Sequence, residues 1–189
     1  FILIGEAACA GFTTYDMLTP EEAKKGAFQP TPPGTAWGEK WQYGWFRTEI
    51  TLPDFAKGKR IIFSPDVGGE MLIWVNGTLA GSKDLEHSYI TLTKCAEGGE
   101  HYDILIESYA GHGPRLENGG PYFPGETPVP EPPLHQVTVG HAVTAIWNEP
   151  AYQVGLDAYT LHKLLRVLDG KSLRAQKVLE ALKQFTYLV

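Results

Sequence analysis

Apolar and polar residues alternate along much of residues 1–148, and this alternation has the period of a β-strand. The alternating segments, strong and weak together, are 45–52, 71–75, 102–107, 137–147, 61–63 and 89–92. Pro53 ends the first of them because proline cannot donate to a sheet ladder. Turn residues separate the segments, and no helical period lies between them. The pattern therefore predicts an antiparallel β-sandwich over residues 1–148.

Two of these segments carry more specific predictions. Residues 71–75 are apolar on both faces, which favours a central place in a sheet. Asn76-Gly77 follows at once and tolerates positive φ, so we expect a type I′ hairpin turn there. Residues 137–147 are expected to form one long strand with an apolar face, and His141 is expected to be buried on that face with one hydrogen bond.

Residues 149–189 change to a helical period. Two apolar stripes at this spacing are Val154, Ala158, Leu161, Leu165 and Leu168, then Ala175, Val178, Leu179, Leu182 and Phe185. Asp169-Gly170 is a suitable helix end, and Ser172 can cap the helix that follows. We therefore expect a C-terminal α-helical hairpin whose apolar faces lie on the sandwich or on a domain outside this chain.

Seven prolines and five glycines lie between Ala110 and His135, and a loop of this length is usually functional. We predict an interaction element that reaches a catalytic domain or a neighbouring subunit, with Arg115, Tyr122 and Phe123 near the cleft. A linker without any partner is the alternative.

Composition excludes several classes of function. The chain has 189 residues, 16 Lys and Arg against 22 Asp and Glu, and a net charge of −6. Because no basic stripe exists to neutralise phosphates, we expect no nucleic-acid partner. No apolar run approaches the roughly 18 residues of a membrane span, so no membrane partner is expected.

Cys9 and Cys95 are too few for a disulfide scaffold. We expect free thiols in a reducing, cytoplasmic compartment, with a single bridge as the alternative.

Motifs for catalysis or metal binding are missing from the sequence. The six histidines lack the spacing of a zinc site, and no serine lies in a Gly-x-Ser-x-Gly elbow. The aromatic residues are better candidates for a ligand site. Trp41, Tyr43 and Trp45 occupy every second position, so all three would point to the same side of a strand. They could form a carbohydrate-binding platform. The alternative is that they belong to the sandwich core or to an interface with a neighbouring domain.

Three runs of residues resemble a known family. They are Trp37-Gly38-x3-Gln42-x2-Trp45-Phe46-Arg47-x-Glu49-Ile50-x-Leu52-Pro53, Gly69-Glu70-Met71-Leu72-Ile73-Trp74-Val75-Asn76-Gly77-x3-Gly81 and Ile104-x-Ile106-Glu107. In order and spacing they resemble the region ahead of the catalytic domain in glycoside hydrolase family 38 α-mannosidases of the cytosolic and bacterial type. The Val-Asn-Gly hairpin also occurs in the galactose-binding-like jelly rolls that open family 2 β-glycosidases. The helical hairpin after the last strand favours family 38.

The resemblance implies a non-catalytic N-terminal jelly-roll domain in a longer α-mannosidase. Family members hydrolyse α-mannosides with a zinc-dependent catalytic domain that carries a His-x-His-x-Asp-type motif and a separate Asp nucleophile. Neither motif occurs here, so no catalytic residue can be transferred to this chain. We expect the chain, which begins at Phe1, to be a piece of the parent. We expect it to have no cofactor of its own, with zinc held by the absent catalytic domain.

The resemblance also suggests partners. They are the catalytic domain of the same chain, an α-mannoside or other glycan, and further copies of the parent in a homo-oligomer. Two alternatives remain open at this point: an autonomous carbohydrate-binding module, and the opening domain of a family 2 β-glycosidase.

Overall fold

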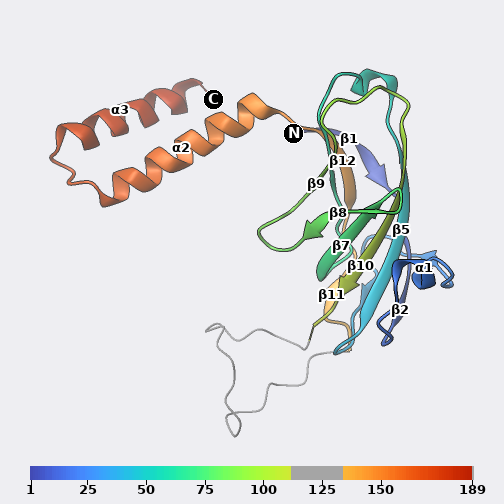
Figure 1. Ribbon diagram of the computed structural model, residues 1–189. Coiled ribbons are helices and arrows are strands. Elements are labelled where there is room, and N and C mark those ends of the chain that lie inside the picture. The colour runs from blue at the N-terminus through green and yellow to red at the C-terminus, as the bar shows by residue number, and fades with distance from the viewer. Residues whose placement is uncertain (112–133, 189) are drawn as a thin grey trace, which may run out of the picture. The chain divides into compact units, whose positions relative to one another are not determined.

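The computed structural model describes residues 1–111 and 134–188. The chain divides into two compact units, Phe1–Trp147 and Asn148–Val189. The first is built of antiparallel β-sheets and the second is a pair of helices, which confirms the predicted fold class (Figure 1). The Pro-rich segment with Arg115, Tyr122 and Phe123 lies outside the described residues.

A four-stranded antiparallel sheet forms one layer of the first unit. Its spatial order is β1 (Ile2–Ala7), β12 (Ala142–Ile146), β6 (Ile61–Ser64) and β9 (Ile90–Thr93). The sequence pattern did not predict β1, because its first residues form a continuous apolar run without alternation. Such short runs are ambiguous until a partner strand is known. Here the partner is β12, paired from Ile2 opposite Ile146 to Ala7 opposite Ala142.

A six-stranded antiparallel sheet forms the other layer (Figure 1). Its order is β3 (Gln29–Pro30), β2 (Ala10–Thr14), β5 (Tyr43–Thr51), β10 (His101–Tyr109), β7 (Glu70–Val75) and β8 (Thr78–Lys83). The two long central strands, β5 and β10, pair along their whole length, from Tyr43 opposite Tyr109 to Thr51 opposite His101. A short two-stranded ladder joins β4 (Ala36–Trp37) to β11 (Val137–Thr138).

The core of the sandwich is filled by the inward positions of the alternating strands. Phe46, Ile50, Phe63, Ile73 and Ile104 are among its buried members. Fully burying one such side chain contributes about 1.5–3 kcal/mol. Trp37 also lies in this core, and its indole nitrogen donates a hydrogen bond to the carbonyl of Val67 at 2.6 Å, so its polar atom is satisfied.

The predicted hairpin turn is confirmed. Asn76 and Gly77 both have positive φ, at 50° and 78°, and join β7 to β8. The expectation for β7 itself was only partly right. The strand has a neighbour on each side, and Met71 and Ile73 are buried, but Leu72 on the opposite face is 41% exposed. The second apolar face of β7 therefore points away from the core.

The predicted long strand at 137–147 was wrong. The chain breaks at 139–141 into β11 and β12, because loop groups take the backbone hydrogen bonds there. Val139 N–H donates to Thr35 O at 2.9 Å, and Gly140 N–H donates to Asp66 O at 2.7 Å. The break also exposes His141, which contacts Glu6 Oε2 at 2.8 Å, so the expectation that it is buried was wrong as well.

The second unit consists of α2 (Glu149–Val167) and α3 (Leu173–Leu188), which contact each other. Asn148 caps α2, and the predicted cap of α3 is confirmed, because Ser172 Oγ accepts a hydrogen bond from Ala175 N–H at 3.1 Å. Val178 of the second predicted stripe is buried and Leu165 of the first is half-buried. Within the described part of the chain, no helix combines the length and the apolar character that crossing a bilayer would require.

Candidate functional site

The candidate site lies on the face of the six-stranded sheet that points away from the sandwich core, which we call the outer face. Strand pairing places its residues in rows across β5, β10 and β7. The rows are Tyr43–Tyr109–Glu70, Trp45–Glu107–Leu72 and Arg47–Leu105–Trp74, followed by the pair Glu49–Asp103 on β5 and β10. These rows combine aromatic, charged and apolar side chains on one surface.

The centre of the outer face is covered. The short helix α1 (Pro20–Ala23) is fixed by a capping box between Thr19 and Glu22. Its Ala23 packs with Trp45 and Leu105 in a second, smaller hydrophobic cluster. Phe12, Leu18, Phe28 and Trp74 pack around this cluster. The centre of the face is therefore a small core rather than a binding surface.

This cover decides where the predicted aromatic platform lies. Trp45 has 0% exposure, and its ring stacks on that of Trp74 at 5.7 Å between centroids. Trp41 precedes β5, has a positive φ of 67° and is 51% exposed. Tyr43 is half-buried and packs against Tyr109. The structure does not bring the three predicted rings onto one exposed surface, because β5 starts at Tyr43 and because α1 covers Trp45. Sugar binding by these residues stays a prediction.

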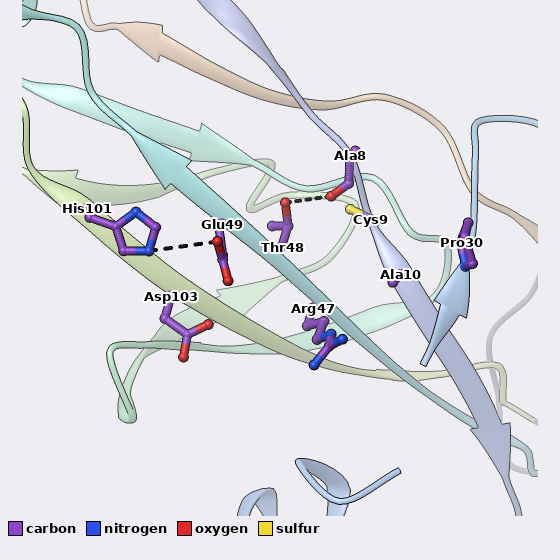
Figure 2. Close-up of a pocket in the computed structure, with 9 residues that line it drawn as sticks. All are labelled: Ala8, Cys9, Ala10, Pro30, Arg47, Thr48, Glu49, His101 and Asp103. Atoms are coloured by element: carbon purple, nitrogen blue, oxygen red, sulfur yellow. Dashed lines mark hydrogen bonds and ion pairs between the residues drawn. The ribbon is translucent and has the colours of Figure 1, made fainter. Parts of the chain in front are cut away.

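A polar depression with a volume of about 780 Å³ lies beside the covered centre (Figure 2). It is lined by Ala8, Cys9, Ala10, Pro30, Arg47, Thr48, Glu49, His101 and Asp103. Glu49 lies directly opposite Asp103 across the two central strands, and His101 Nε2 is 4.0 Å from Glu49 Oε2. Thr48 is the buried member, and its hydroxyl donates to Ala8 O at 2.8 Å.

Two opposed carboxylates invite comparison with a glycosidase pair, because directly opposed strand residues have Cβ atoms about 4.5–5.5 Å apart. Retaining enzymes place their carboxyl groups about 5–5.5 Å apart around the scissile bond. Here, however, the Glu49 side chain is 74% exposed and Asp103 is exposed too. Water reaches both groups, so this pair lacks the distinct acid and base environments that such catalysis requires.

Cys9, whose thiol also lines the depression, is not an activated nucleophile. Burial raises the pKa of the Cys9 thiol to about 11, against a smaller lowering by a hydrogen bond with Thr48. The thiol is therefore protonated near neutral pH, whereas nucleophilic attack needs the thiolate. Cys9 and Cys95 are both free in the structure.

No metal centre is assembled by the described residues. Across 1–111 and 134–188, no three His, Cys, Asp or Glu side chains lie close enough together to hold an ion. The resemblance places the zinc of an α-mannosidase in a catalytic domain outside this chain, and that placement stays a prediction.

A second hollow lies on the outer face over β5, β10, β7 and β8, with a volume of about 400 Å³. Its lining includes Tyr43, Tyr109, Glu107 and Leu72, and we call it the tyrosine–glutamate hollow. Of these residues, sequence reasoning had proposed only Tyr43 for a site. The sequence signal for the hollow is the second apolar face of 71–75, a pattern that by itself indicates burial in a sheet centre.

Comparison with known proteins places these observations in a family. A family model described as "Alpha-mannosidase, jelly roll domain" matches residues 6–124. Human Alpha-mannosidase 2C1 is 32% identical over 71 residues, which make up 38% of this chain and 7% of that protein. Alpha-mannosidase G of Dictyostelium discoideum is 34% identical over 96 residues, 48% of this chain and 9% of that protein. The chain spans less than a tenth of these relatives.

Solved structures with a similar chain course include two bacterial enzymes. Faecalibacterium prausnitzii Beta-glucuronidase has 14% sequence identity and a TM-score of 0.47, over 78% of this chain and 31% of that chain. A putative beta-galactosidase from Bacteroides fragilis has 15% identity and a TM-score of 0.47, over 75% and 22% of the two chains.

Proposed function

Because the chain belongs to the alpha-mannosidase jelly roll domain family, we propose that it serves as a non-catalytic accessory domain that packs against a zinc-dependent catalytic domain and shapes its cleft. The observation that carries this proposal is the family match over residues 6–124 in a chain that spans less than a tenth of its relatives. The parent is then an enzyme that hydrolyses α-mannosides, and the chemistry takes place outside this domain.

The side-chain arrangement supports a non-catalytic role. The opposed Glu49 and Asp103 carboxylates are open to water, and the Cys9 thiol is held protonated. The described residues contain no cluster of three metal-ligating side chains. We therefore propose that the zinc of the parent is bound by residues of the catalytic domain, where it would polarise the reacting sugar.

The surface supports a packing role. Leu79 on the edge strand β8 and Leu85 after it are exposed, at 55% and 92%. Exposed apolar residues near a sheet edge are typical of surfaces that another chain or domain covers. We propose that the catalytic domain of the same protein covers this region.

Two further proposals rest on the family alone. They are that the parent assembles into a homo-oligomer and that it is located in the cytoplasm.

The proposal is tested by assaying purified 1–189 with an aryl α-mannoside, with and without added zinc. We expect no turnover above the buffer rate in either condition. The full-length parent serves as the matched positive control, prepared in the same buffer and assayed with the same substrate. Zinc-dependent turnover by 1–189 that survives further purification would overturn the proposal.

A further inference from the structure

We propose that the tyrosine–glutamate hollow is a binding subsite for a neutral hexopyranose, with Glu107 accepting hydrogen bonds from sugar hydroxyls while Tyr43 and Tyr109 contact the apolar face of the ring. This site adds a ligand-binding function to the packing role proposed above. It does not depend on that role, because it rests on the local geometry of β5, β10, β7 and β8.

The two tyrosines form the aromatic wall of the hollow. Tyr43 and Tyr109 lie directly opposite each other on β5 and β10, and their ring centroids are 5.0 Å apart with planes tilted by 32°. Both side chains are half-buried, so the rings are held in place while part of their surface stays accessible. The negative face of an aromatic ring attracts the C–H groups that line one face of a pyranose.

Glu107 supplies the polar side of the hollow. It lies two residues before Tyr109 on β10 and therefore projects from the same face, between Trp45 on β5 and Leu72 on β7. Glu107 is half-buried, and it has no hydrogen-bond or ion-pair partner among the residues that the structure describes. Burial also raises the pKa of its carboxyl group. An unpaired carboxyl group beside apolar surface is costly until a donor reaches it.

This combination selects the class of ligand. An apolar protein surface placed over the hollow would cover Leu72 but would leave the Glu107 carboxyl without a partner. A pyranose satisfies both sides, because its hydroxyls donate to a carboxylate while its C–H face covers the aromatic rings. The observations thus favour a saccharide over an apolar protein surface at this position.

The size and charge of the hollow narrow the class of sugar that it can bind. Its volume of about 400 Å³ falls in the range of small-molecule sites, about 300–1,000 Å³. Ser82 and Lys83 also line it, and the Ser82 hydroxyl can donate to a sugar oxygen. The Lys83 ammonium lies 3.8 Å from Asp66 Oδ1. Glu70 and Asp84 also line it, so the local charge disfavours an acidic sugar. We therefore assign the subsite to a neutral hexose rather than a uronic acid.

The polar depression of Figure 2 provides an internal comparison on the same face of the sheet. It is nearly twice as large, but its lining contains no Phe, Tyr or Trp on which a sugar ring could stack. Its carboxylates are exposed and hydrated, so a sugar there would only exchange one set of hydrogen bonds for another. Saccharide binding is thus expected at the smaller hollow, and Glu49 in the depression is a matched control for Glu107.

The test is a titration of ¹⁵N-labelled 1–189 with methyl α-D-mannopyranoside, followed by two-dimensional NMR. We expect saturable shifts at amides of β5, β10 and β7 around Tyr43 and Glu107, with a Kd in the millimolar range. Tyr109→Ala should weaken binding by about tenfold or more, and the shape-conserving Glu107→Gln by about fivefold. Glu49→Gln should bind like the wild type. Methyl β-D-glucuronide should bind more weakly than the mannoside because of its charge.

Three results would overturn the assignment. The first is the absence of saturable shifts for methyl mannoside, glucoside and galactoside up to about 50 mM. The second is a set of shifts centred on the polar depression. The third is a Glu107→Gln variant, folded by its NMR spectrum, that binds as tightly as the wild type. None of these results bears on whether the domain packs against a catalytic domain, so the two proposals fail separately.

Discussion

The carboxylate of Asp66 fills the space that a side chain on Gly140 would occupy. A Cβ atom on Gly140 would lie 2.7 Å from Asp66 Cγ and would overlap Oδ2. Gly140 N–H also donates to the Asp66 carbonyl at 2.7 Å. These two contacts hold the chain at the break between β11 and β12, where the sequence pattern had suggested one continuous strand.

We therefore predict that Gly140→Ala lowers the free energy of unfolding by about 1–3 kcal/mol, because overpacking forces the neighbouring loop to shift. Urea unfolding at equilibrium measures the change. Gly5→Ala is the matched control, since nothing lies within 4 Å of its Cβ position. Adding Asp66→Ala to Gly140→Ala should restore most of the lost free energy of unfolding, because it removes the carboxylate that a side chain at position 140 would meet. A double variant as unstable as Gly140→Ala alone would contradict the explanation.

The two tryptophans of the predicted platform should behave differently on truncation. Trp45 is fully buried under α1, so Trp45→Ala should cost about 3–5 kcal/mol in the free energy of unfolding. Trp41 is half exposed, so Trp41→Ala should cost less than about 1 kcal/mol. The change from Trp to Ala keeps the strain of the positive φ at position 41, so strain does not distort this comparison. Equal costs for the two variants would mean that α1 does not cover the outer face.

The buried thiol of Cys9 predicts a pH dependence of stability. Its pKa rises from an ordinary value of 9.0 to about 11 in the folded chain, so between these values the unfolded chain releases the proton more readily. Stability from this group is fully present below pH 9 and falls as the pH rises toward 11. Urea unfolding at pH 8 and pH 10.5 measures the effect. The free energy of unfolding should fall more between these two pH values for the wild type than for Cys9→Ala. A drop of the same size in both would show that Cys9 does not titrate as described.

The cap of α3 can be tested within the second unit. Ser172→Ala removes the acceptor of the Ala175 N–H and should weaken the helix by about 1 kcal/mol, because one backbone donor of the first turn loses its partner. Ser172→Asp keeps an acceptor and is the matched control. Hydrogen exchange at the amides of residues 173–176 measures the effect. Unchanged exchange in Ser172→Ala would show that the hydroxyl does not cap the helix.

The elements that sequence reasoning found are those specified by local signals. Alternation defined β5 and β10, and Asn76-Gly77 fixed the turn between β7 and β8. The break at Gly140 could not be found in this way, because it depends on hydrogen bonds to Asp66 and Thr35, which are distant in sequence. Valines at alternating positions on both sides of the break gave a pattern typical of one strand.

The candidate site was less predictable than the fold for the same reason. The burial of Trp45 depends on α1, and the environment of Glu107 depends on pairing with Trp45 and Leu72 from two other strands. In the sequence, Glu107 is simply a polar position in an alternating run. The spacing of Trp41, Tyr43 and Trp45 suggested a shared face, but it could not show that the strand begins at Tyr43.

The central claim is that this jelly roll domain packs against a catalytic domain in the full-length protein. Hydrogen–deuterium exchange of residues 1–147, compared between the isolated 1–189 chain and the full-length protein, tests it most directly. We predict that a contiguous set of sandwich amides exchanges at least about tenfold more slowly in the full-length protein, because its backbone groups are covered there. Identical exchange rates across the whole sandwich would contradict the claim.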